Sequence, residues 1–509
     1  MCRGFLFLWQ KKSLLFYSFL FFLFSANPIF SQFDNCAESF SLKKKESNIN
    51  EQKICPDLLQ KDLSELYDKI DEAHPNPFVF CSKKAWDEKY QLIVEECKKP
   101  KTFFEFSKLI ASWLSLLQDS HTSLDPDLML WEFKKHHYMF PFMLSRINKK
   151  FYAKHFINEL IPHGNEILSI NEFSADSLFN LSLCFAIKEG ESYTAQQSYA
   201  TYLMGFVYNL CNNFHYNDTI VIKHQDINGD TLTSILPSYS PRERKRYFNK
   251  YSWNKVHDIE FKISSKQNIG VLTVNTFSPK KNKKFEADIN KFFQLIKERD
   301  IENILIDLRN NTGGYFYYVN ELMDYIDTTK LIREKNFICK RSFLDDYSNM
   351  GFFNKLFFKL SCKLNKDAAF QKECSFYNTE YGHIDTLYEK HSYHFKDFYK
   401  FNGNCFLAIN GMSISASVDF TSWFMKSARG VVLGEACMGP YTGTWGNPRI
   451  TYLSNTKLAV VISTIRNNLS NEFIHSKNPI RPDIEIPKNI KDYRNRKDPI
   501  VKYILKNLL

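Results

Sequence analysis

The stretch Ile304-Leu-Ile-Asp-Leu-Arg-Asn-Asn-Thr-Gly-Gly314 joins a short apolar run to a polar loop that ends in two glycines. A continuous apolar run of this length suits a strand that is buried on both faces, as strands of parallel sheets are. Another helix is expected after the loop. Gly313 and Gly314 let the backbone approach a ligand closely, although a tight turn that needs positive φ would favour them equally. The stretch therefore predicts an α/β fold, with a loop of interest at a strand end.

The segments before and after this stretch also alternate between short apolar runs, typical of strands, and helical patterns. Residues 269–274 form an earlier apolar run, and a helix with an apolar face from Phe285 to Ile296 follows it. Further short apolar runs occur at 406–409 and 431–433. The order of strands and helices predicts a parallel sheet in an α/β core over residues 241–509. The segment at about 336–402, rich in Phe, Tyr and Lys, fits this alternation poorly and is interpreted as an insertion of unpredicted fold.

Two regions with different sequence patterns precede the core, one typical of helices and one typical of strands. Residues 55–138 are interpreted as a helical domain, because apolar positions recur at helical spacing before His74-Pro75, where a helix should stop. Thr102 and Glu105 have the spacing of a capping box at the start of a second helix. Residues 139–240 change to short alternating strands, which predicts a β-rich domain.

The first 32 residues resemble an export signal. Basic residues precede an apolar run from Leu14 to Phe24, and small or polar residues continue to Ser31. The run is short for a membrane span of about 20 residues, so a removable signal peptide is favoured over an uncleaved membrane anchor. Polar residues 33–54 suggest a flexible leader. We expect a periplasmic or secreted protein, with a membrane-anchored one as the alternative.

Composition excludes several classes of function. The 509 residues are 44% hydrophobic, enough for large cores, and the net charge is +11. Basic residues are spread among acidic ones, so we expect no nucleic-acid partner and at most a loose association with the membrane surface. Twelve cysteines lack the close paired spacing of zinc sites, so no metal is expected. Their disulfide pairing stays open.

Two further segments carry chemistry. Gly411-Met-Ser-Ile-Ser-Ala-Ser417 lies between an apolar strand and a helical pattern. A serine on such a turn can expose its hydroxyl beside helix amides that stabilise developing negative charge, although serine is also a common plain helix cap. Asp119-Ser-His-Thr122 follows the capped helix, and His121 has the chemistry of a general base. An exposed histidine without a role is the alternative.

Together these segments resemble a family. With Val431-Val-Leu-Gly-Glu435, they look like the signature blocks of tail-specific, or carboxyl-terminal processing, serine proteases and their tricorn relatives. Pro162 to Asn171 resembles the carboxylate-binding region of the PDZ-like domain in that family. The processing branch places a catalytic lysine shortly after the glutamate, where this chain has Ala436-Cys-Met-Gly-Pro440. The sequence is therefore more similar to the tricorn branch, whose adjacent serine and histidine match Ser120-His121.

The resemblance implies the fold and the activity. It implies an α/β, multidomain α+β architecture with a helical N-terminal domain, a PDZ-like domain over residues 139–240 and a crotonase/ClpP-like catalytic core. It also implies a serine peptidase that hydrolyses peptide bonds of protein or peptide substrates, without metal or cofactor. The alternative is a catalytically inactive protein that keeps the fold and binds peptides.

Residue roles follow from the same resemblance. Ser415 is the implied nucleophile, His121 the base, and Ser120 an orienting residue. The family's late glutamate aligns near Ser476, and Glu472 is the glutamate close to that position. The amides of Ala416 and of Gly313 or Gly314 are the expected oxyanion donors.

Overall fold

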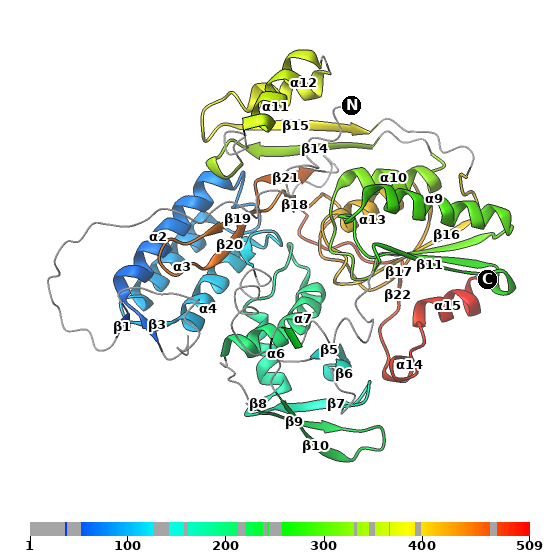
Figure 1. Cartoon of the computed structure of the whole chain (residues 1–509), viewed down its shortest axis with the longest axis horizontal. Helices are drawn as coiled ribbons and strands as arrows, with labels where there is room; N and C mark the ends of the chain where they lie inside the picture. Colours follow the sequence, from blue (N-terminus) through cyan, green and yellow to red (C-terminus); the bar gives the residue numbers. More distant parts are fainter. Residues whose placement is uncertain are drawn as a thin grey trace.

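The structure is a computed structural model, and it describes residues 36–37, 52–125, 142–156, 161–211, 219–237, 240, 242–243, 257–329, 333–345, 352–365, 367–391, 399–468 and 476–509. The signal peptide expected at residues 1–32 lies outside these residues. The described chain has a mixed α/β fold, as predicted. Figure 1 shows the N-terminal helices on one side, the α/β core on the other, and the middle region beneath them.

The N-terminal region is mainly helical. Its elements are β1 (Cys36–Ala37), β2 (Lys53–Ile54), α2 (Pro56–Ala73), α3 (Lys83–Glu96), β3 (Lys101–Thr102), α4 (Phe103–Leu114), η2 (Ser115–Leu117) and β4 (Ser123–Leu124). Helix α2 ends just before His74-Pro75, as predicted. The capping box is also confirmed, because the Thr102 hydroxyl accepts from the Glu105 amide and the Glu105 carboxylate accepts from the Thr102 amide.

The two ends of the expected leader are tied to this region. Strand β1 pairs in parallel with β2, and Cys36 forms a disulfide with Cys55 at the start of α2. Residues 38–51, between the two short strands, lie outside the described ones.

The middle region contains a sheet in the order β10-β9-β7-β6-β5, with β8 paired to β7. Its elements are β5 (Phe142–Ile147), β6 (Lys150–Phe156), β7 (Glu166–Ile170), β8 (Phe173–Ser174), α6 (Ala175–Leu183), α7 (Tyr193–Cys211), β9 (Thr219–Gln225) and β10 (Thr231–Pro237). The strands confirm the prediction of a β-rich region, whereas the helices α6 and α7 were not predicted. Helix α7 is buried on several sides, so its sequence lacks the single apolar stripe that marks a surface helix.

The α/β core confirms the predicted parallel sheet. Its strands follow the order β11-β12-β13-β16-β17-β22; β12 to β22 run parallel, and β11 pairs antiparallel at the edge. The strands are β11 (Ile259–Ser264), β12 (Ile269–Val274), β13 (Asn303–Asp307), β16 (Asn404–Ile409), β17 (Gly430–Gly434) and β22 (Ile484–Glu485).

Helices cover both faces of this sheet. They are α9 (Asn282–Glu298), α10 (Phe316–Ile326), α13 (Ala416–Lys426), α14 (Ile490–Arg494) and α15 (Pro499–Asn507), with η3 (Ser265–Gln267) between the first two strands. One apolar cluster joins the sheet to α9, α10 and α13, and a second joins its other residues to α15. The beginning of α13 is thus held at the carboxyl end of β16, where ligands of parallel sheets usually bind.

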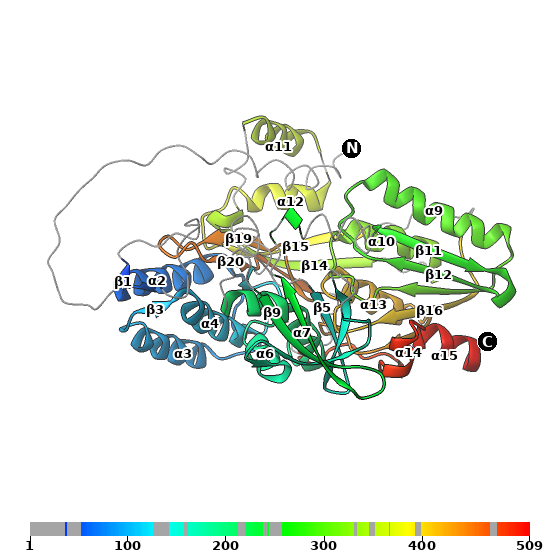
Figure 2. The same cartoon turned by 60° about the horizontal axis from the view of Figure 1, so that its bottom comes forward.

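The segment interpreted as an insertion is built on a β-hairpin. It contains β14 (Arg333–Lys340), η4 (Phe343–Asp345), α11 (Phe352–Leu364), α12 (Ala368–Phe376) and β15 (Ile384–His391). Strand β14 pairs antiparallel with both β15 and β21. Figure 2 shows α11 and α12 beyond this hairpin, at the outer end of the molecule.

Late strands link the N-terminal region to the rest of the chain. They are β18 (Trp445–Gly446), β19 (Arg449–Tyr452), β20 (Ala459–Ile462) and β21 (Ile465–Asn468). Strand β20 pairs with β4, so the residue after β20, Ser463, lies next to the Asp119 loop. Among the helices of the described residues, none combines the length and the apolarity that a bilayer-spanning segment needs.

Candidate active site

Ser415 occupies the turn that joins β16 to α13. It is the residue before the first helical position, with φ 56° and ψ −119°, and its side chain makes no capping hydrogen bond. A positive φ is uncommon for a residue with a Cβ and costs roughly 1–3 kcal/mol, which the surrounding structure must offset. The Ser415 hydroxyl therefore does not act as a helix cap, the alternative role considered for this segment.

Two neighbouring serines differ from Ser415 in burial and bonding. The Ser413 hydroxyl donates to the carbonyl of Leu308 at 2.8 Å, and the Ser417 hydroxyl donates to the carbonyl of Asn311 at 2.8 Å. Both side chains are fully buried, whereas Ser415 is partly exposed. These contacts hold residues 411–417, called here the serine turn, against residues 308–314, called here the Gly-Gly loop. Ser415 is left as the serine of the turn that a substrate can reach.

The Gly-Gly loop lies directly against Ser415. Gly313 and Gly314 have φ 100° and 141°, which side chains rarely allow. A Cβ added to Gly313 would lie 2.7 Å from Ser415 Cβ and 3.0 Å from the nitrogen of Ala416. The Gly313 amide already donates to Asn311 Oδ1 at 2.9 Å. Of the three expected oxyanion donors, Gly314 and Ala416 are thus the two whose amides stay open to a ligand among the described contacts.

The substitution Gly313→Ala should lower kcat by about 100- to 1000-fold. The new methyl group must displace Ser415 Cβ or the Ile414 carbonyl, which lies 2.8 Å away, and a misplacement of about 1 Å costs that much. Steady-state peptide hydrolysis measures the effect. Gly229→Ala is the matched control, because Gly229 has φ 94° but nothing within 4 Å of an added Cβ. Equal activity of the two variants would contradict the placement of the loop.

Asp119 is the centre of the loop that carries the predicted serine-histidine pair. Its Oδ2 accepts from Thr122 Oγ1 at 2.5 Å and Ser463 Oγ at 2.6 Å, and it lies 3.1 Å from His74 Nε2. Its Oδ1 accepts the backbone N–H of His121 at 2.7 Å. Burial acts to raise the pKa of Asp119, but the His74 and Ser463 contacts outweigh it and the pKa lies below its usual range. An ionised Asp119 therefore fixes the backbone of His121.

The imidazole of His121 is oriented by a chain of two hydrogen bonds. The Ser120 hydroxyl donates to Glu189 Oε2 at 2.5 Å and lies 3.0 Å from His121 Nδ1. A hydroxyl has one hydrogen, so after donating it to Glu189 the Ser120 oxygen accepts a hydrogen from Nδ1. In the neutral ring, Nε2 is then the acceptor. The residues Glu189, Ser120 and His121, called here the histidine relay, thus prepare Nε2 to take a proton.

Glu189 was not predicted from the sequence. It lies in the loop between α6 and α7, is fully buried, and its Oε1 accepts the backbone N–H of Trp445 at 2.9 Å. Burial, reinforced by the charge of Asp119, raises the pKa of Glu189 to about 8, while Arg466 at 3.9 Å and the Ser120 hydroxyl act in the opposite direction. The histidine relay therefore operates with Glu189 ionised, above that pKa. The side-chain contacts that mark Glu189 come from Ser120 and Trp445, which are distant in the chain, so no local sequence pattern could identify it.

A buried ion pair connects the histidine to the first turn of α13. Lys335 Nζ lies 2.7 Å from Asp419 Oδ2, and both side chains are buried. The charges of both residues act on the His121 ring. Burial lowers the pKa of His121 and Lys335 adds to this, whereas Asp119 and Asp419 oppose it. The net lowering favours the neutral imidazole, which is the form that a general base requires.

Asp119, His121 and Glu189 also have ligand atoms within 4.8 Å of one another, which is close enough to hold a metal ion. The carboxylate oxygens of both acids already accept hydrogen bonds from protein groups. These bonds account for the arrangement, so we assign the cluster to orienting the histidine. Glu472, the glutamate expected from the sequence, lies outside the described residues.

A large groove lies elsewhere on the described residues. It has a volume of about 1550 Å³ and runs beside β11 and α15, where Phe261, Lys262 and Lys502 are among its lining residues. None of the residues of the serine turn, the Gly-Gly loop or the histidine relay lines it. The groove is therefore separate from the candidate site.

Comparison with protein families finds a match over part of this chain. Residues 268–486 match the model of peptidase family S41, a range that contains the Gly-Gly loop and the serine turn but not the histidine relay. The match supports a peptidase, and this range lacks a lysine where the processing branch has its catalytic one. No curated protein matches the sequence.

Solved structures of CPAF show the same fold. A crystal structure of a CPAF mutant aligns with a TM-score of 0.61 and 12% identity, covering 89% of this chain and 98% of its own. Mature CPAF complexed with lactacystin aligns with a TM-score of 0.60 and 12% identity, covering 89% and 99%. The tricorn protease covers 89% of this chain and 36% of its own, with a TM-score of 0.37 and 14% identity.

Proposed function

We propose that this chain, which resembles the tail-specific and tricorn-type peptidases of family S41, is an exported serine peptidase with Ser415 as nucleophile and His121 as base. The observation that carries the proposal is the histidine relay. Its bonds turn Nε2 of His121 into a proton acceptor, and the serine turn offers a partly exposed hydroxyl with no capping bond. A protein that only bound peptides would need neither.

The reaction is acyl transfer to Ser415. Nε2 of His121 takes the Ser415 proton while the oxygen attacks the scissile carbonyl, and the amides of Gly314 and Ala416 hold the resulting oxyanion. His121 then gives the proton to the leaving amine, and the C–N bond breaks. Water, activated by the same imidazole, hydrolyses the acyl enzyme and restores Ser415. Each good oxyanion donor contributes about 3–4 kcal/mol to this step.

Within this proposal Glu189 takes the part that the sequence resemblance assigned to Glu472. The Ser120 hydroxyl transmits the orientation of the Glu189 carboxylate to Nδ1 of His121. The carboxylate stabilises the imidazolium that forms when Nε2 takes a proton, through an intervening hydroxyl instead of direct contact. Glu189 is thus a positioning residue and does not touch the reacting atoms.

Export and peptide capture complete the proposal. The export signal at residues 1–32 is supported by the disulfides Cys36–Cys55 and Cys362–Cys374, because such bonds persist in oxidising compartments. The middle region would act as the PDZ-like domain. Its stretch from Pro162 to Asn171 contains β7 and the turn before it, where Gly164 has φ 84°. Protein or peptide chains are the substrates.

Labelling with a fluorophosphonate probe tests the nucleophile and the base together. Wild type should be labelled, Ser415→Ala should not, and the labelling rate should fall as the pH falls, because protonated His121 is no longer a base. Protonation of Glu189, whose pKa is raised to about 8, should already slow labelling as the pH falls through that value. Since the folded protein lowers the pKa of His121, a second fall should follow below the ordinary histidine value of about 6.5.

Equal labelling of wild type and Ser415→Ala would reject Ser415 as nucleophile. A labelling rate that shows no further fall below the ordinary histidine value would reject the neutral His121 as base. If the folded wild type neither takes up the probe nor cleaves peptides, the catalytically inactive peptide-binding protein becomes the better reading.

A further inference from the structure

The outer helix of the insertion, α11, exposes an unusual amount of apolar surface. Leu356 and Leu360 are each 47% exposed, and Leu364 is 78% exposed. Residues four apart lie on the same face of a helix, so these leucines form one row along α11. Phe357, which is 54% exposed, lies beside this row. We call these four residues the leucine face.

Lysines form the adjacent row of the same helix. Lys355, Lys359 and Lys363 each precede a leucine of the leucine face, and they share one face by the same spacing of four. Lys359 and Lys363 are exposed and Lys355 is half-buried. The sequence of α11 contains no aspartate or glutamate, so the charge of this helix is entirely positive.

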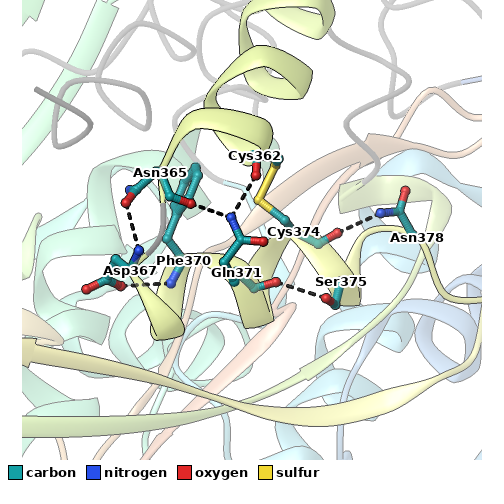
Figure 3. Close-up of a disulfide and its surroundings, with 8 residues drawn as sticks. All are labelled: Cys362, Asn365, Asp367, Phe370, Gln371, Cys374, Ser375 and Asn378. Carbon is teal, nitrogen blue, oxygen red and sulfur yellow. Dashed lines mark hydrogen bonds between the residues drawn. A yellow bond between two sulfur atoms is a disulfide. The ribbon is translucent and has the colours of Figure 1, made fainter.

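The opposite row of α11 is held by the rest of the insertion. The Phe358 ring packs edge-on against Phe370 and Tyr377, and Cys362 forms a disulfide with Cys374 in α12. Figure 3 shows this disulfide together with Gln371, whose Nε2 donates to the carbonyl of Cys362 at 2.7 Å. These contacts fix which side of α11 faces the protein and which faces outward.

The leucine face and the lysine row together have the composition of a helix that lies in a membrane surface. Such helices carry Leu and Phe on one side and Lys on the other, and they sink their apolar side below the headgroups of the lipid. Figures 1 and 2 place α11 beyond the β14–β15 hairpin at the outer end of the molecule, so the body of the protein does not stand between it and a flat surface.

We propose that α11 docks this protein onto an anionic lipid surface, with the leucine face among the acyl chains and the lysine row against the headgroups. A second copy of the chain suits the face less well, because it would bring a second row of lysines towards the first. The disulfide to α12 would keep the helix presented in this direction. The inference is independent of the peptidase mechanism.

Vesicle sedimentation tests the proposal. The chain from residue 33 onward is used under non-reducing conditions, because the apolar run near the N-terminus would itself bind lipid. We expect binding to vesicles of phosphatidylcholine mixed equally with phosphatidylglycerol, weak binding to phosphatidylcholine alone, and weakening with added salt. The pair Lys359→Ala and Lys363→Ala should lower the affinity about 30-fold, at about fivefold for each lysine.

Two further variants isolate the contribution of each row. Leu360→Ser should lower the affinity about tenfold without changing thermal unfolding, since Leu360 contributes exposed surface. Lys283→Ala with Lys291→Ala, which removes two exposed lysines of α9, is the control of equal charge change and should leave binding unchanged.

Several outcomes would overturn the proposal. These are no binding to anionic vesicles, equal binding to neutral ones, or an equal loss of affinity in the α9 control, which would indicate only a general effect of charge. A wild-type dimer that Leu360→Ser dissociates in sedimentation equilibrium, without lipid binding, would assign the leucine face to contact between copies.

Discussion

Replacing Ser415 by alanine is expected to reduce casein hydrolysis by the chain from residue 33 onward by 10⁴- to 10⁶-fold, on the order seen when a serine peptidase loses its nucleophile. His121→Ala should cause a comparable loss, because the serine is a weak nucleophile without its base. The double variant should be hardly worse than either single one, since residues that act as a unit are not additive. Initial rates at saturating substrate measure all three.

Ser413→Ala is the matched control for this experiment. Ser413 lies two residues from Ser415, but its hydroxyl is used in a buried bond to the carbonyl of Leu308. Its loss also removes the bond that its oxygen accepts from the Asn410 N–H at 3.1 Å, so it should cost about 2 kcal/mol of stability and leave hydrolysis within about tenfold of wild type. If Ser415→Ala alone were inactive and His121→Ala remained active, the base would lie elsewhere and the histidine relay would have no catalytic role.

Glu189→Gln should lower kcat by about 10²- to 10⁴-fold and should also cost about 1–3 kcal/mol of stability, because one buried hydrogen bond is lost. The amide nitrogen of glutamine cannot accept the hydrogen bonds that Glu189 now receives. If it replaces Oε2, the Ser120 hydroxyl must turn its hydrogen towards Nδ1 of His121, and Nε2 then carries the ring proton and cannot act as base. If it replaces Oε1, it meets the Trp445 N–H, and the carboxylate charge is lost in either case.

The paired variant Glu472→Gln decides between the two glutamates. Under the proposed relay it should keep wild-type activity, whereas Glu189→Gln should not. The opposite result would restore Glu472 as the orienting residue and would leave Glu189 a structural partner of Trp445 and Arg466. A melting temperature for each variant separates loss of activity from loss of fold.

The parts of the fold that follow local patterns were predictable. Helix α2 and the Thr102–Glu105 capping box depend on residues within a few positions of one another, and the structure confirms both. The parallel strands of the core could be predicted for the same reason, because each is a continuous apolar run. Helix α7 was missed because burial on several sides removes the amphipathic period from its sequence.

The serine turn and the relay differ in the same way. The serine turn could be located because a strand, a serine-rich segment and a helix follow one another directly in the chain, whereas the choice of Ser415 among its serines rests on the family resemblance. Glu189 could not be located, because its contacts reach Ser120, 69 residues before it, and Trp445, 256 residues after it. Only folding brings these residues together, so contacts of this kind cannot be predicted from a local sequence pattern.

These long separations also constrain when the protein can become active during its synthesis. Asp119 is bonded to Ser463, 344 residues further on, and Glu189 to Trp445, so the histidine cannot be fixed before nearly all of the chain has left the ribosome. A nascent or truncated chain that already contains the serine turn still lacks the late strands that hold its base. An unfinished chain of this protein is therefore not expected to cleave peptides while it is still being synthesised.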